Sequence, residues 1–204
     1  MKYHILYTFR RCPYAIRARW ALLLTGQQVI CREINLEDKP SELLLASSKG
    51  TVPVLITNKG LIIEESLLII SWALKNRKLT EKFKVNSQET KLLITQNDNQ
   101  FKYHLDRYKY PGRFLDPNPD YHRRQATNIL IEWNQRLKSS KSVFKWLVAE
   151  EESLADWSLW PFVRQFRNID PSSFDSNNDI LELKIWLDTF LQSPFYIPLM
   201  YKYK

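Results

Sequence analysis

The chain of 204 residues is poor in glycine, cysteine and histidine, with 4 Gly, 2 Cys and 3 His. So few glycines argue against a Gly-rich nucleotide loop and against a turn-dense β-sandwich. Three scattered histidines and two cysteines form no zinc-ligand pattern, so we expect no metal site. No uncharged apolar run approaches the ~18–20 residues of a membrane span, and the N-terminus lacks the pattern of a signal peptide. We therefore expect a cytoplasmic protein with no membrane partner.

Bulky apolar residues are abundant. The composition is 44% hydrophobic and 25% charged, with 7 Trp, 10 Tyr and 10 Phe, which is enough to fill a real core and excludes disorder as the main state. The formal net charge is +8. The basic residues are interleaved with acidic ones in groups of only two or three, which indicates a solvated basic surface. We do not expect nucleic acid as a partner.

The first third of the chain alternates between strand and helix patterns. A strand, a helix and a second strand form a βαβ unit, whose two strands are expected to be parallel. A short helical piece follows, then two apolar runs joined by Asn58-Lys59-Gly60 as an antiparallel hairpin, and then a helix. The ranges are strand 3–8, helix 13–25, strand 29–35, helix 39–45, strands 54–57 and 61–64, and a helix from residue 66.

The rest of the chain is helical. Long helical patterns cover residues 86–108, 122–137, 154–167 and 180–191, with loops expected at 111–119 and 170–178. We therefore expect a small α/β domain over residues 1–76, with βαβ–ββα order and a mixed sheet. A polar linker over 77–83 would connect it to an all-α helical domain over 84–204.

Cys12 stands where the first strand passes to the first helix. Pro13 fits the first helical position, which leaves Cys12 at the helix N-terminus, where unpaired N–H groups and the helix dipole favour an anion. Arg10, Arg11 and Arg17 are close in sequence. Such surroundings lower a thiol pKa to about 3.5–7.5, so we expect a thiolate at neutral pH.

Only one thiol fits this reactive position. Ala15 occupies the place of a resolving cysteine three residues on, so any covalent intermediate of Cys12 is a mixed disulfide with another molecule. Cys31 lies inside the second expected strand, and we interpret it as structural.

Two further motifs could bind a ligand through the backbone or at a helix start. Pro53 heads an apolar strand, and a cis bond after Val52 would turn the Val52 backbone outward to pair with a peptide. An ordinary trans proline is the alternative. Ser66, which we expect at the N-cap of the next helix, has an ordinary capping role, but the same geometry also binds a carboxylate. Glu65 could hold an ammonium group, and Lys39 could hold a second carboxylate or be a plain surface lysine.

Together these motifs resemble the glutathione transferase superfamily, and within it the cysteine-type, omega-like or glutaredoxin-like classes. The resemblance extends over nearly the whole chain. The motifs that carry it are Cys12-Pro13-Tyr14, residues 35–40, 51–55 and 65–66, and in the helical half Ser153-Leu154-Ala155-Asp156-Trp157 with Trp160-Pro161-Phe162.

The resemblance implies a thioredoxin-like first domain that binds glutathione as co-substrate. It implies that Cys12 is catalytic and that Val52, with cis Pro53, pairs with the cysteinyl backbone of glutathione. Glu65 and Ser66 would hold the γ-glutamyl end, and Lys39 the glycine carboxylate. It also implies a homodimer, and a structural capping box formed by the residues at 153 and 156.

Three functions remain open on the sequence. The first is a glutathione-dependent thiol transferase or reductase that acts through a mixed disulfide of Cys12 with glutathione. The second is a glutathione S-transferase that conjugates glutathione to small electrophiles, with Tyr7 as candidate hydroxyl donor or simply a packed tyrosine. The third is a non-catalytic binding or regulatory protein of the same fold, which would need no reactive thiol.

Overall fold

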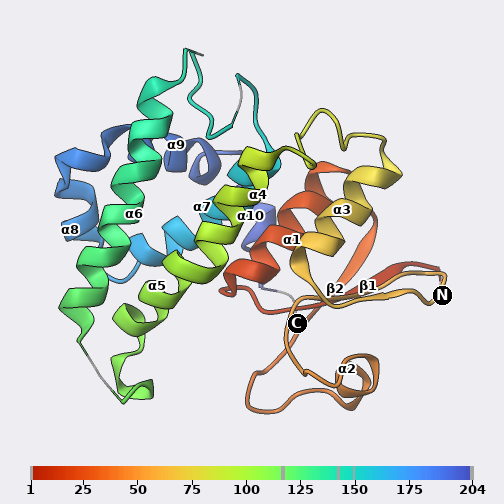
Figure 1. Cartoon of the computed structure of the whole chain (residues 1–204). Helices are drawn as coiled ribbons and strands as arrows, with labels where there is room; N and C mark the ends of the chain where they lie inside the picture. The colour runs from red at the N-terminus through yellow and green to blue at the C-terminus, as the bar shows by residue number, and fades with distance from the viewer. Residues whose placement is uncertain (1, 116–117, 142, 149, 203–204) are drawn as a thin grey trace. The chain divides into compact units, whose positions relative to one another are not determined.

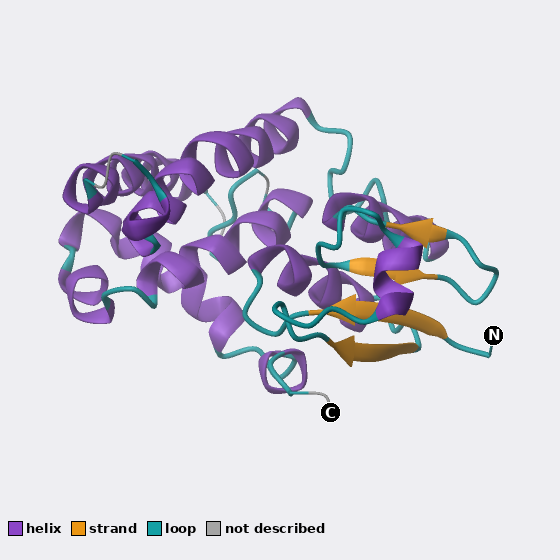
Figure 2. Cartoon of the chain, turned by 90° about the horizontal axis from the view of Figure 1, so that it is seen from below, coloured by secondary structure: helices purple, strands orange, loops and turns teal. Residues whose placement is uncertain are grey.

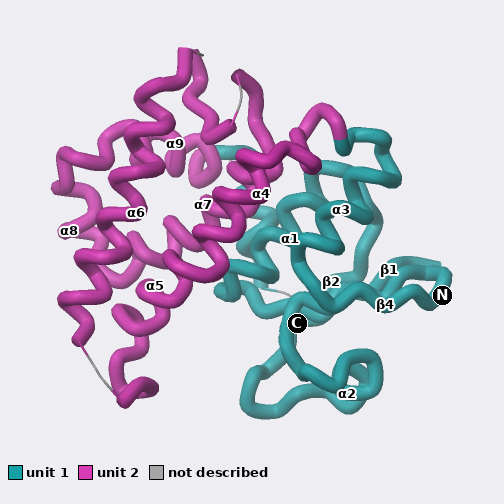
Figure 3. The backbone as a smooth tube through the Cα atoms, in the orientation of Figure 1, with its two compact units in different colours: residues 1–80, 193–204 teal, residues 81–192 magenta. Residues whose placement is uncertain are grey.

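A computed structural model describes every residue except 1, 116–117, 142, 149 and 203–204. The chain forms two compact units, one made of residues 1–80 and 193–204 and the other of residues 81–192 (Figure 3). The C-terminal segment thus groups with the first unit, which the helical pattern of the sequence did not indicate. The domain boundaries expected from the sequence stay a prediction.

The first unit is built on a four-stranded mixed sheet of order β2-β1-β3-β4 (Figure 2). β1 pairs with β2 in parallel and with β3 antiparallel, and β3 pairs with β4 antiparallel, which confirms the expected βαβ–ββα order. The elements are β1 (His4–Thr8), α1 (Pro13–Leu24), β2 (Val29–Glu33), α2 (Ser41–Ala46), β3 (Val54–Ile56), β4 (Ile62–Ile63), α3 (Ser66–Asn76) and α10 (Tyr196–Leu199).

Helices cover both faces of this sheet. α1 and α3 contact each other on one face, and α2 lies on the other (Figure 1). Leu43 of α2 is buried with Tyr7, Ile34 and Val54 in one apolar cluster. The register of β1 and β3 is therefore fixed, because a one-residue slip would turn Tyr7 or Val54 to the opposite face of the sheet.

The second unit is helical throughout its regular structure. A continuous helical rod joins α4, a π-helical segment and α5, which confirms the long helix expected over 86–108. The elements are α4 (Gln88–Thr95), η1 (Gln96–Phe101, π), α5 (Lys102–Lys109), η2 (Pro111–Arg113, 3-10), α6 (Pro119–Ser139), α7 (Leu154–Arg167), α8 (Pro171–Ser176), η3 (Asn178–Ile180, 3-10) and α9 (Leu181–Leu191).

Two expected loops contain helical structure. The segment 170–178 was expected to be a loop, but it contains α8, which begins with Pro171 and is capped by the Asp170 side chain. Its polar composition concealed two ordinary helix-start signals, a capping Asp followed by Pro. In the segment 111–119, η2 forms, and Pro119 is already the first residue of α6.

The capping box at the start of α7 is present as expected. The Ser153 side chain accepts from the Asp156 N–H, and the Asp156 side chain accepts from the Ser153 N–H. Asp156 Oδ1 also accepts from the Leu147 N–H at 3.0 Å and from the Trp186 indole N–H at 2.9 Å. One buried carboxylate therefore joins the start of α7 to α9 and to the preceding loop.

Two kinds of feature are absent from the residues that the structure describes. None of the helices there is both long enough and apolar enough to cross a membrane. Nor do the described residues contain a group of three or more His, Cys, Asp or Glu side chains that could hold a metal ion.

Candidate active site

Cys12 is the N-cap residue of α1. Its backbone is extended, with φ −74° and ψ 121°, and its carbonyl accepts the Ile16 N–H at 2.9 Å as the first bond of the helix. The thiol makes no capping hydrogen bond to the helix, and the residue is partly exposed. The sulfur therefore stands at the positive end of a twelve-residue helix, as the sequence predicts.

Hydrogen bonds from β2 and from α1 hold the loop that carries Cys12. The Arg10 N–H donates to Glu33 Oε1 at 2.8 Å, and Arg19 Nη2 donates to the Arg10 carbonyl at 2.8 Å. The Cys12 N–H donates to the Phe9 carbonyl at 3.0 Å. Glu33 lies at the end of β2, and its role is one that sequence reasoning missed, because only the folded sheet brings it to this loop.

The sequence led us to expect that arginines would surround the Cys12 thiol, but Arg11 and Arg17 have other contacts. Arg17 is fully buried, with its guanidinium 5.3 Å from the centre of the Tyr14 ring. The Arg11 guanidinium lies 5.6 Å from the centre of the Phe9 ring. Both guanidinium groups thus lie over aromatic rings, and the helix terminus is the clearest source of positive potential at the sulfur.

Val52 and Pro53 lie beside the thiol. The Cys12 sulfur is 3.8 Å from the Val52 carbonyl oxygen, and the peptide bond between Val52 and Pro53 is cis. The structure therefore brings together two motifs that are 40 residues apart in the sequence. The cis alternative, and not the trans one, is the form observed.

Lys39 lies over the turn that precedes Val52. A Cβ placed on Gly50 would be 3.4 Å from Lys39 Nζ and 3.1 Å from a methyl group of Leu44. Gly50 also has a φ of +56°, a conformation that suits glycine. The Lys39 side chain therefore passes close to the backbone that leads into the cis-proline turn.

Glu65 and Ser66 stand at the start of α3, but in different positions from those expected. Glu65 is the N-cap residue, and Ser66 is the first helical residue and is buried. The expectation that Ser66 caps the helix is therefore wrong. Glu65 Oε1 lies 2.7 Å from the ammonium group of Lys49, a residue to which no signal in the sequence points.

The expected residues thus share one stretch of chain, the segment 49–53. Cys12 contacts it at Val52, Lys39 contacts it at Gly50, and Glu65 contacts it at Lys49. A nucleophilic sulfur, a turn with a cis proline, and charged groups of both signs border the same segment. Such a site suits a short peptide with a charge at each end and a thiol between.

The two other sequence candidates are Tyr7, which belongs to the buried cluster against which Val52 packs, and Cys31, which lies in β2. Tyr7 is 2% exposed, and its hydroxyl accepts from Arg32 Nη1 at 3.2 Å. Cys31 pairs with Leu6 in the parallel ladder and is partly exposed, and it lines a small cavity of about 90 Å³ with Arg19 and Leu199 among others.

Comparison with known families finds a similarity in the first part of the chain. Residues 6–81 match the family described as "Glutathione S-transferase, N-terminal domain". This part of the chain, less than half of its length, is therefore similar to the N-terminal domain of glutathione S-transferases. The match spans Cys12, Lys39, the cis-proline turn, Glu65 and Ser66. No curated protein matches the chain in a sequence search.

Solved structures extend the likeness to the whole chain. A glutathione transferase family member from Pseudomonas fluorescens with two glutathione bound aligns with a TM-score of 0.81 and 18% identity, over 98% of this chain and 92% of that one. Glutathione transferase Omega 3C from Trametes versicolor gives 0.77 and 17%, over 100% and 91%. Glutathione S-transferase-I bound with lactoylglutathione gives 0.76 and 21%, over 97% and 98%. The chain therefore has the glutathione transferase fold, a thioredoxin-like domain followed by a helical domain.

Proposed function

We propose that the protein is a glutathione-dependent thiol transferase or reductase that acts through a mixed disulfide between Cys12 and glutathione. The observation that carries this proposal is the position of the Cys12 sulfur, at the N-cap of α1 and 3.8 Å from the Val52 carbonyl. A helix N-terminus favours the thiolate, which is the nucleophile in disulfide exchange.

The reaction takes two exchanges. The Cys12 thiolate attacks the glutathione sulfur of a glutathionylated substrate, the substrate's S–S bond breaks, and the substrate sulfur leaves as a thiolate that takes a proton from water. The thiolate of a second glutathione then attacks the glutathione sulfur held on Cys12. This step releases glutathione disulfide and restores the Cys12 thiolate.

The residues around the segment 49–53 supply the binding contacts of this proposal. Val52 would pair with the cysteinyl backbone of glutathione beside Pro53, Lys39 would bind the glycine carboxylate, and Glu65 with Ser66 would bind the γ-glutamyl end. These roles are supported by the shared placement of the residues and by solved structures of the same fold that contain glutathione or its conjugates. A cytoplasmic location and a homodimer stay predictions.

Conjugation of small electrophiles has weaker support. Tyr7, the candidate hydroxyl donor for that chemistry, is buried and bonded to Arg32. Cys12 is the better placed group for chemistry, because it is partly exposed and stands at a helix terminus. A protein with a purely binding role would not need a reactive thiol at this position.

Glutathionylation by glutathione disulfide tests the proposal. The protein is incubated with glutathione disulfide and analysed by peptide mass spectrometry, and we expect one glutathionyl group, on Cys12. Cys31→Ser is the matched control and should be modified as the wild type is, whereas Cys12→Ser should lose both the modification and the exchange activity. Modification of Cys31 alone, or of neither cysteine, contradicts the proposal. Retained conjugation in Cys12→Ser would favour the second function.

A further inference from the structure

Two neighbouring apolar side chains are exposed on the chain between α6 and α7 (Figure 1). Val143 is 92% exposed and Phe144 is 69% exposed, and the backbone bends at both residues. Single exposed apolar residues are common on protein surfaces, so the position and the surroundings of this pair decide what it can bind. We refer to Val143 and Phe144 as the apolar tip.

Hydrogen bonds fix the chain on both sides of the apolar tip. Lys145 Nζ donates to the Ser140 carbonyl at 2.6 Å, which links the residue after the tip to the end of α6. Arg136 Nη1 donates to the Leu147 carbonyl at 3.2 Å, and the Leu147 N–H donates to Asp156 Oδ1 at 3.0 Å. Leu147 is also buried. The chain therefore returns to the core of the helical unit directly after the tip.

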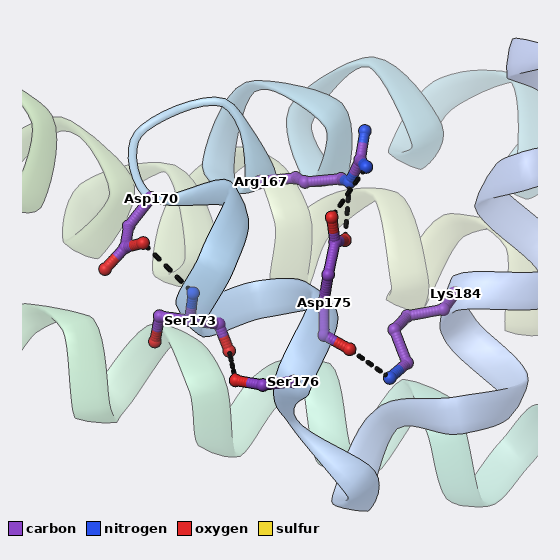
Figure 4. A network of polar contacts seen from close by, with 6 residues as sticks. All are labelled: Arg167, Asp170, Ser173, Asp175, Ser176 and Lys184. Carbon is purple, nitrogen blue, oxygen red and sulfur yellow. Dashed lines mark hydrogen bonds and ion pairs between the residues drawn. The ribbon is translucent and has the colours of Figure 1, made fainter.

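The aromatic residue that follows the tip packs inward. The centre of the Trp146 ring is 6.1 Å from that of Phe190, a buried residue of α9. α9 is itself attached to α8 and α7, because Lys184 donates to the Asp175 carbonyl at 2.8 Å and Arg167 donates to both carboxylate oxygens of Asp175, at 2.7 and 2.8 Å (Figure 4). The exposure of the apolar tip thus belongs to an anchored loop, which a binding partner would not have to order.

Lysines surround the apolar tip. Lys141 precedes it by two residues, Lys145 follows it directly, and Lys138 lies in the last turn of α6. No acidic residue occurs between positions 132 and 150. The one arginine of this stretch, Arg136, is paired with Glu89 at 3.3 Å, whereas the three lysines make no ion pair with any of the described residues. The tip therefore has a surplus of positive charge around it.

An apolar tip among lysines suits the surface of an anionic membrane better than it suits a protein. Apolar side chains enter the boundary between headgroups and acyl chains, and the long lysine side chains place their charges at the level of the phosphates. Protein interfaces are depleted in lysine, and a stable one takes about 20–30 residues from each partner. The tip and its lysines offer far fewer.

We propose that the apolar tip and the three lysines around it bind the surface of a membrane that contains anionic phospholipid. Val143 and Phe144 enter the headgroup region, and the lysines lie against the phosphates. The binding is weak and reversible, because only two apolar side chains enter and the exposed Glu150 and Glu151 follow along the chain. The expectation of no membrane partner rests on the lack of a spanning segment, which does not bear on binding at the surface. The proposal is independent of the thiol chemistry of Cys12.

Cosedimentation of the whole protein with lipid vesicles tests this proposal. One set of vesicles is phosphatidylcholine alone, and the other contains phosphatidylserine as well. We expect binding to the anionic set, and at least about fivefold weaker binding to the neutral set or at high salt, where the lysine charges are unmatched or screened. Phe144→Ala should weaken binding to the anionic set at least about tenfold, because less apolar area is buried. Lys141→Gln should weaken it about fivefold.

Two matched controls separate the tip from the rest of the surface. Leu45→Ala and Lys59→Gln remove an exposed leucine and an exposed lysine from the first unit, and they should leave binding within about twofold of the wild type. An equal loss in Phe144→Ala and Leu45→Ala overturns the proposal. If Phe144→Ala does not fold, Lys141→Gln against Lys59→Gln decides.

The wild type alone can also overturn the proposal. Failure to bind the anionic vesicles at low salt, or equal binding to both sets, would show that the tip is not a membrane contact. If the wild type then forms a dimer in gel filtration that Phe144→Ala does not form, the tip contacts a second copy of the chain instead.

Discussion

Lys49 Nζ lies 2.7 Å from Glu65 Oε1, and both side chains are more than half exposed, at 54% and 60%. The Glu65 carboxylate raises the pKa of Lys49 through their hydrogen bond and the opposite charge. Glu65 is also the residue that we propose for the ammonium group of glutathione. A ligand ammonium would therefore share this carboxylate with Lys49, or displace the lysine from it.

Lys49→Gln should strengthen glutathione binding. The substitution removes a competitor for Glu65, so we expect the Kd to fall, and only by a small factor because an exposed ion pair contributes little. Glu65→Gln should weaken binding, and Lys59→Gln, an exposed change in the hairpin turn, should have no effect. Titration calorimetry measures all three. Weaker binding in Lys49→Gln would mean that the lysine itself contacts glutathione.

Glu33 should control the reactivity of Cys12 through the loop between β1 and α1. Glu33→Ala removes the acceptor of the Arg10 N–H, a hydrogen bond of 2.8 Å to a charged group. Such a bond contributes about 1.5–3 kcal/mol, so we expect lower stability and slower glutathionylation of Cys12. Glu37→Ala, at an exposed site nearby, is the control. Lower stability with an unchanged rate would show that Glu33 does not position the thiol.

Much of the first unit could be predicted because its signals are local. Pro13 begins α1, Gly26 follows its end with a φ of +63°, and Asn58-Lys59-Gly60 forms the hairpin turn with a φ of +82° at the glycine. Each of these residues imposes a backbone conformation without help from the rest of the fold. The capping box of α7 is the corresponding case in the helical unit.

What the sequence did not predict depends on contacts between distant residues. The pairing of Lys49 with Glu65 and of Glu33 with the Arg10 N–H exists only after the sheet has formed. Glu65, and not Ser66, is the N-cap residue because its backbone is extended, with φ −107° and ψ 133°. The sequence Glu64-Glu65-Ser66 alone does not determine which of these residues caps the helix. By contrast, α8 could have been predicted from Asp170 and Pro171.

The capping box of α7 should be a major source of stability for the helical unit. Ser153→Ala should lower the free energy of unfolding by about 0.5–2 kcal/mol. Asp156→Ala should cost more, about 3–5 kcal/mol, because it leaves the Leu147 N–H and the Trp186 indole N–H without their buried acceptor. Urea denaturation measures both, with Ser153→Thr as the control that keeps the hydroxyl. Equal losses for Ser153→Ala and Asp156→Ala would contradict this account.

Glu152 should make the protein less stable as the pH rises. Burial, and after it the neighbouring Asp156 carboxylate, raise the pKa of Glu152 to about 7 from the ordinary 4.5. The folded state then holds a proton that the unfolded state has lost, so stability falls between about pH 4.5 and 7. At 1.36 kcal/mol per unit, the loss is on the order of 1–3 kcal/mol.

Glu152→Gln isolates this effect. Glutamine imitates the protonated side chain, so the variant should match the wild type at pH 4.5 and be more stable at pH 8. Glu150→Gln, two residues earlier, is the control and should keep the pH dependence of the wild type. Thermal unfolding across this range measures the difference. A wild type and Glu152→Gln with parallel pH profiles would refute the assignment.

The His104–His122 pair should make the protein less stable as the pH falls, whereas Glu152 should make it less stable as the pH rises. Their Nδ1 atoms are 2.8 Å apart and join α5 to α6 by a hydrogen bond in which one ring must donate and the other accept, so both rings cannot be protonated. Burial lowers the pKa of His104 below its ordinary 6.5, and His122 and the Arg107 guanidinium lower it further. Below pH 6.5 the unfolded chain therefore takes up the proton first, and stability falls as the pH falls.

His104→Gln keeps a hydrogen-bonding side chain but removes the titration. We expect this variant to lose less stability than the wild type between pH 7.5 and 5.5, as measured by urea unfolding at both pH values. His4→Gln gives the separate effect of the other histidine whose pKa burial lowers, because His4 lies in the other unit and its substitution leaves the α5–α6 bond intact. Glu152 is expected to raise stability as the pH falls over part of the same interval. The two histidine variants are therefore best compared in a Glu152→Gln background, which removes that effect. If His104→Gln then loses as much stability on acidification as its parent, the histidine pair is not the group that titrates.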